Sequence, residues 1–163
     1  MTKFSRMFLR MERFAKRFPC LFASLWFAVA GLIVPTLWFL LATLKRGDIV
    51  SAVLYGVLPV VAAAIAGALL GTPIVCSAQA MSARRAIERG VGVGLLAVAI
   101  FVPLFAMCYA GTARQGIVYV PALMGVVAVM CVFVAGIPIA LIAGTAGWLL
   151  YRLALHIDRT IQT

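Results

Sequence analysis

The sequence predicts an all-α integral membrane protein in which four transmembrane helices form two tandem hairpins behind an amphipathic interfacial helix. Apolar residues make up 66% of the chain, and its mean hydropathy is +1.17. Only 14 Lys or Arg and 4 Asp or Glu occur among 163 residues, too few charges for the surface of a soluble domain. These charges cluster, and the apolar runs between the clusters are long enough to cross a hydrocarbon core of ~30 Å. Because the runs are continuously apolar, helices are expected rather than barrel strands.

The first segment, residues 1–19, has the pattern of a helix that lies in the headgroup plane. Phe and Met recur at three- and four-residue spacing, and basic residues recur in the same way on another face. Pro19 is expected to stop or bend this helix. A disordered basic tail that only fixes orientation is the alternative. The side chains predicted to contact anionic phospholipid headgroups are Lys3, Arg6, Arg10, Arg13 and Arg17.

The rest of the chain divides into two hairpins. Residues 20–80 form the first and residues 91–155 the second, joined by a basic cytoplasmic connection at 81–90 and followed by a tail at 156–163. Two of the apolar runs, 49–80 and 117–155, would make straight helices of ~48 and ~58 Å, longer than a bilayer core needs. Each run is therefore expected to bend. For residues 139–155 a helix extension, an interfacial helix and a fifth span all stay open.

Two Gly-x-Pro motifs are the predicted bends, Gly71-Thr72-Pro73 and Gly136-Ile137-Pro138. Each follows a Val-Pro pair and an Ile-Val pair upstream. The spacing from the proline to Ile-Val is identical in both copies, and the run on to Gly-x-Pro differs by three residues, which suggests a parallel internal repeat of two spans each. Paired interruptions of this kind are also where transporters build their pathways, because freed carbonyls can line a cavity. The alternative is that these residues only set kinks for packing, and that the short matches arise by chance.

Small residues four positions apart predict close helix packing. Such ridges let another backbone approach a membrane helix closely. The two predicted ridges are Ala63, Gly67 and Gly71, and Gly136, Ala140 and Gly144.

Orientation follows from the Lys and Arg residues outside the spans. With four spans, eleven of them lie on the side of the two termini and three on the other side. The positive-inside rule then places both termini in the cytoplasm, in a membrane such as the bacterial inner membrane. The net charge of +10 is explained by this bias and by affinity for anionic lipid, so no nucleic acid is expected as a partner.

The spans carry none of the ionisable groups that transport coupling or catalysis normally places in a membrane. Four scattered cysteines and a single histidine match no metal motif, so we expect neither an enzyme nor a cofactor or metal site. The leading hypothesis is a non-enzymatic accessory, assembly or immunity-type subunit that packs against a membrane-protein partner. The alternatives are a homo-oligomeric channel or transporter with its pathway at the Gly-x-Pro breaks, and a holin-like or membrane-remodelling protein.

Overall fold

The computed structural model describes residues 11, 13–42, 56–112, 120–131 and 136–159, and their side chains at 11, 13–33, 56–110, 120–131 and 136–156. All elements in these ranges are helical. The long helices are α2 (Pro19–Ala42), α6 (Ala83–Thr112) and α8 (Gly136–Arg159). The shorter elements are α4 (Leu58–Ala66), the π-helix η2 (Gly67–Gly71), α5 (Thr72–Cys76), the 3-10 turn η3 (Ala78–Ala80) and α7 (Val120–Met130).

Three of the described helical segments are long and apolar enough to cross a membrane: Leu58–Cys76, Ala83–Ala110 and Gly136–His156. The described apolar parts of α2 and α7 are shorter than this. The chain is therefore a helical membrane protein.

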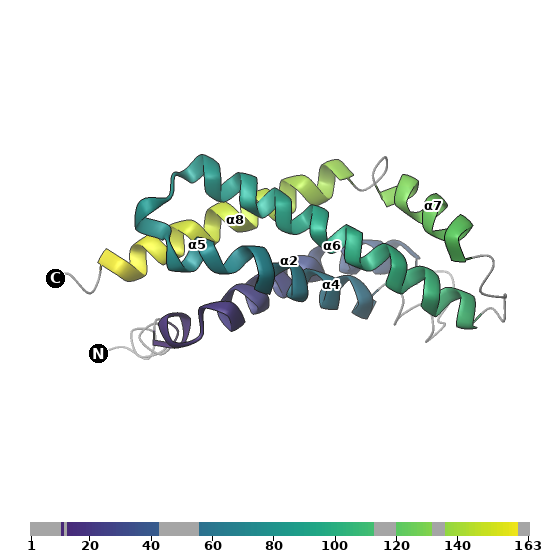
Figure 1. Cartoon of the computed structure of the whole chain (residues 1–163), viewed down its shortest axis with the longest axis horizontal. Coiled ribbons are helices and arrows are strands. Elements are labelled where there is room, and N and C mark those ends of the chain that lie inside the picture. Colours follow the sequence, from purple (N-terminus) through teal and green to yellow (C-terminus); the bar gives the residue numbers. More distant parts are fainter. Residues whose placement is uncertain (1–10, 12, 43–55, 113–119, 132–135, 160–163) are drawn as a thin grey trace.

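The helices run back and forth along one long axis (Figure 1). α2 leads away from the beginning of the described chain, α4 to α5 return, α6 leads away again, and α7 and then α8 return in the same direction. α6 is the longest helix, and α7 and α8 pack on successive parts of it. The structure thus shows one elongated bundle in which α7 and α8 together follow the direction opposite to α6.

The core is built from a few aromatic and aliphatic side chains set among many alanines. Phe22 and Phe27 of α2, Ile74 of α5, and Val93 and Leu150 from α6 and α8 are all buried in it. Large apolar side chains such as Leu25 and Leu95 instead face outwards. A bundle that is apolar on both its inside and its outside suits hydrocarbon rather than water.

The first described residues extend α2 backwards past Pro19. Residues 13–17 are helical. Phe18 N–H donates to the Phe14 carbonyl at 2.9 Å, and Phe22 N–H donates to the Phe18 carbonyl at 3.0 Å. Because Pro19 occupies the first position of α2, its missing N–H interrupts little of the helix.

The two Gly-x-Pro motifs adopt different local structures. At the first, the chain stays helical but widens into η2 before Pro73. A proline cannot bond the carbonyl four residues earlier and clashes with it, and a π-bulge relieves that conflict. At the second, the motif begins α8, and Pro138 lies in the first turn, where its missing N–H removes no bond. The first predicted bend therefore coincides with irregular helix geometry, and the second coincides with the start of a helix.

Residues 139–155 lie inside α8, which is continuous from Gly136 to Arg159 and packs along α6. Whether this segment is a helix extension, an interfacial helix or a fifth span stays a prediction. In the described chain α7 ends at Met130 and α8 begins at Gly136.

Candidate functional site: helix junctions and the exposed α7 surface

The predicted ridge Ala63, Gly67 and Gly71 lies against α2 of the same chain. A Cβ added at Gly67 would come 2.7 Å from Phe27 Cβ, and one added at Gly71 would come 2.8 Å from Phe27 Cε2. Ala63 is the nearest residue to Gly31, where an added Cβ would come 2.7 Å from the Ala63 Cβ. This ridge is therefore occupied within the monomer and is not free to receive a partner.

The residues of the second predicted ridge, Gly136, Ala140 and Gly144, differ in burial. Gly144 is buried, and a Cβ there would come 3.4 Å from Ile87 and Val91 side-chain atoms of α6. Gly136 and Ala140 are only half-buried. The nearest atom to a Cβ built on Gly136 would be the Cys131 carbonyl oxygen, at 3.6 Å. Only the later part of this ridge thus lies in a close helix contact.

The closest helix contact in the described chain is one that the ridge prediction missed. Gly90 and Gly94 of α6 face Ala143 and Gly147 of α8. A Cβ at Gly147 would lie 2.7 Å from the Ala86 carbonyl oxygen and 2.8 Å from Gly90 Cα, so the two backbones touch. Small residues spaced by four, at 86, 90 and 94, were the available signal. They lie partly in the stretch assigned to a cytoplasmic connection.

One side-chain hydrogen bond ties the first helix to the last. Trp26 Nε1 of α2 donates to the Ala146 carbonyl of α8 at 2.9 Å. The indole N–H is thereby satisfied inside an apolar bundle, where an unpaired donor would be costly. α2 and α8 are thus held side by side near the close α6–α8 contact.

The first Gly-x-Pro motif has its freed backbone partly satisfied. Thr72 Oγ1 donates to the Ala68 carbonyl at 2.6 Å, across the π-helix. Among the described residues no buried side-chain nitrogen or oxygen lacks a hydrogen-bond partner. The Thr72 hydroxyl therefore satisfies a backbone carbonyl of the π-helix, and Pro73 lines a surface groove rather than an internal passage.

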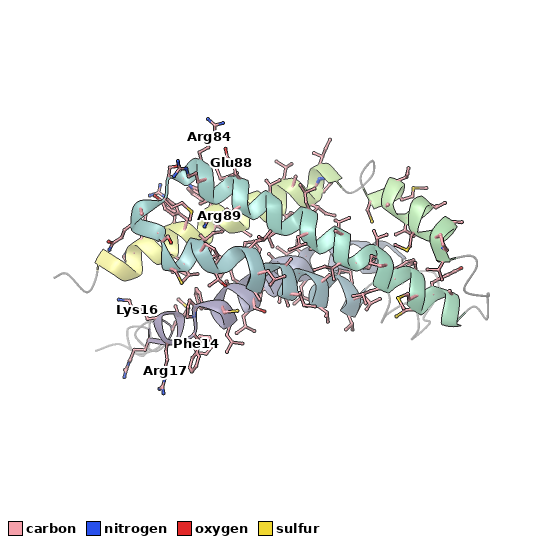
Figure 2. All side chains as sticks on the ribbon, in the orientation of Figure 1. Phe14, Lys16, Arg17, Arg84, Glu88 and Arg89 are labelled. Carbon is pink, nitrogen blue, oxygen red and sulfur yellow. The ribbon has the colours of Figure 1, made fainter. Side chains whose placement is uncertain are left out.

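The predicted lipid-contact segment is only partly described, since Lys3, Arg6 and Arg10 lie outside the described residues. Arg13 and Arg17 are exposed, and the Arg17 guanidinium lies 5.6 Å from the centre of the Phe18 ring. The apolar residues of this segment differ in burial: Ala15 is buried in the core, whereas Phe14 and Phe18 are exposed. Figure 2 shows the labelled charged side chains of this segment and of α6 towards the same end of the bundle.

Helix α7 differs from every other described helix, because none of its residues is buried. Val126 is 60% exposed, and nothing lies within 4 Å of a Cβ built on Gly125. The neighbouring end of α6 is also exposed, at Met107 and Tyr109. This combined surface of α7 and the neighbouring end of α6 is called the α7 surface below.

The described residues hold no group of three or more His, Cys, Asp or Glu that could bind a metal ion. The four cysteines, at 20, 76, 108 and 131, are all free thiols. No protein family, curated protein or solved structure matches the chain.

Proposed function

We propose that the protein is a small non-enzymatic subunit of a membrane complex, bound to a helical membrane partner through the α7 surface. The proposal rests chiefly on α7 itself. Eleven residues make a helix of about 16 Å, roughly half of a ~30 Å hydrocarbon core. Its apolar side chains cover no core of their own.

In this proposal α2, α4 to α5, α6, and α7 with α8 make four passes, with both termini on the cytoplasmic side. The gathering of Lys16, Arg17, Arg84 and Arg89 towards one end of the bundle supports that orientation (Figure 2). The proposed interface does not depend on whether the two hairpins arose from one internal repeat.

A matched pair of photo-crosslinking sites tests the proposal. A photoreactive amino acid replaces Val126 on α7 in one variant and Val29 on α2 in the other, positions that are 60% and 63% exposed. Irradiation in intact membranes should give one discrete protein adduct from position 126 and only lipid adducts from position 29. Mass spectrometry identifies the adducts.

The other outcomes separate the competing functions. An adduct of this chain with a second copy of itself at position 126 would favour the homo-oligomeric channel instead. Lipid adducts alone from both positions would contradict a partner at the α7 surface. A holin-like protein should lose its effect on vesicle leakage when residues 1–17 are deleted, whereas the proposed subunit should stay inserted and give the same adduct.

A further inference from the structure

A groove on the opposite side of α6 from α8 combines charge with apolar surface. Its volume is about 550 Å³, and its lining comes from η2, from α5 and from the first turns of α6. The lining residues are Leu70, Pro73, Arg85, Glu88, Arg89 and Gly92. We propose that this groove binds one anionic phospholipid, with the phosphate on Arg85 and Arg89 and an acyl chain against Leu70 and Gly92.

The helix geometry places the charged and apolar parts in the order that a lipid requires. Arg85, Arg89 and Gly92 are separated by four and three residues and so share one face of α6. The arginines lie nearer the beginning of the helix, at the end of the bundle where charged side chains gather (Figure 2). Leu95, one turn beyond Gly92, is exposed. Along this face the surface thus changes from cationic to apolar, as a phospholipid changes from headgroup to acyl chain.

The charge balance leaves the groove positive. Glu88 is the only carboxylate among the described side chains, and its Oε1 accepts a hydrogen bond from Arg84 Nε at 2.8 Å. Arg84 therefore offsets the one negative charge on the lining. No ion pair of Arg85 or Arg89 is found within the described residues. Two guanidiniums four residues apart provide donors suited to phosphate oxygens.

The space beneath the arginines exists because position 92 has no side chain. The one atom close to a Cβ built on Gly92 would be Leu70 Cδ1, at 3.8 Å, an ordinary contact. A larger side chain at position 92 can therefore enter the groove without displacing the backbone. Gly92→Leu fills the site and leaves its charge unchanged.

The test measures lipid retention by the full chain in a neutral detergent, using native mass spectrometry with phosphatidylglycerol and phosphatidylcholine as probes. The unchanged protein should retain one phosphatidylglycerol in preference to phosphatidylcholine. Arg85→Gln with Arg89→Gln should lower phosphatidylglycerol occupancy about tenfold or more, because charge-assisted hydrogen bonds are lost. Gly92→Leu should lower the occupancy of the same lipid severalfold.

Arg152→Gln is the matched charge control. Arg152 lies on α8, 5.3 Å from the centre of the Trp148 ring, and outside the groove. This variant should retain phosphatidylglycerol within twofold of the unchanged protein. An equal loss in Arg152→Gln and in the double variant would overturn the site in favour of unspecific attraction. Circular dichroism on each variant verifies that the helices are intact, and the double variant tests the proposal even where Gly92→Leu does not fold.

A competition experiment distinguishes binding of a whole phospholipid from binding of a soluble phosphate compound. Glycerol phosphate at the same concentration should not displace bound phosphatidylglycerol, because it lacks the acyl chain that Gly92 accommodates. Displacement at equal concentration would overturn the lipid assignment in favour of a soluble phosphate compound. The lipid site does not depend on the α7 partner, so failure of either experiment leaves the other proposal standing.

Discussion

Helices α8 and α7 cover successive parts of the same helix, α6, by different means. α8 meets α6 through glycine and alanine, and its Gly147 lies so close that a Cβ would come 2.7 Å from a backbone oxygen of α6. α7 also contacts α6, but none of its residues is buried. Lipid tails are as apolar as these side chains, so burial in a membrane depends on close fit rather than on hydrophobicity. The two segments come from one apolar run, but α8 packs closely within the chain whereas α7 leaves its residues without burial.

The largest expected effect comes from removing the close fit of α8. Gly147→Leu places side-chain atoms where the α6 backbone lies, against Ala86 O and Gly90 Cα. We expect a loss of about 3 kcal/mol or more in the free energy of unfolding, at or above the usual range for overpacking. Unfolding in mixed detergent, followed by circular dichroism, measures it.

Gly125→Leu on α7 is the control for that change. The side chain is the same, but nothing lies within 4 Å of the added Cβ. The free energy of unfolding should change by less than about 0.5 kcal/mol, as for other surface substitutions. Equal losses in the two variants would show that α7 packs as closely as α8 and would remove the contrast.

A smaller effect is expected at the α2 contact. At Gly67→Leu the added Cβ would come 2.7 Å from Phe27 Cβ and 3.1 Å from the Ala23 carbonyl oxygen, so only one of these two close atoms belongs to the backbone, whereas both close atoms at Gly147 do. We expect a loss of about 1–3 kcal/mol from the isolated monomer. Measuring stability and oligomeric state together distinguishes the alternatives: if association is lost while monomer stability is unchanged, this ridge faces a partner rather than α2.

The hydrogen bond between α2 and α8 should contribute less. Trp26→Phe removes the N–H that donates to the Ala146 carbonyl and keeps most of the apolar ring. Since a typical hydrogen bond contributes about 1 kcal/mol net, we expect a loss near that value in the unfolding assay. A loss below about 0.3 kcal/mol would indicate that this bond does not help to hold α2 against α8.

The smallest effect on the monomer is expected at the α7 surface. Val126→Ala with Val129→Ala should leave the free energy of unfolding within about 0.5 kcal/mol, because both side chains are more than half exposed. The same pair should reduce co-purification of the partner that is crosslinked at position 126. A stability loss of 2 kcal/mol or more would show that α7 belongs to the core.

Composition alone was sufficient to predict the helical membrane fold, because continuous apolar runs between charge clusters have few other solutions. The bend predicted at Gly71 coincides with the π-helix η2, and the bend predicted at Gly136 coincides with the first residue of α8. The structure identifies three described helices of spanning length, so the expected count of four remains a prediction.

The site was less predictable than the fold. Small residues at spacing four mark a close contact but do not say which helix fills it, and Gly67 faces Phe27 some forty residues earlier. The contact at Gly90 was missed because Arg84, Arg85 and Arg89 suggested a connecting segment, whereas these residues begin a 30-residue helix. The groove was equally hidden, because its lining joins residues from two separate helices.

The bond between Trp26 and Ala146 has a consequence for how the chain is made. Its donor and acceptor are separated by 120 positions, so during synthesis the indole enters the membrane long before the carbonyl that will accept from it exists. Until α8 has been inserted, the Trp26 N–H either stays unpaired in an apolar environment, which is costly, or donates to another protein. The nascent protein should therefore be most dependent on insertion machinery until its last helix is translated, and chains truncated before α8 should be poor substitutes for the whole.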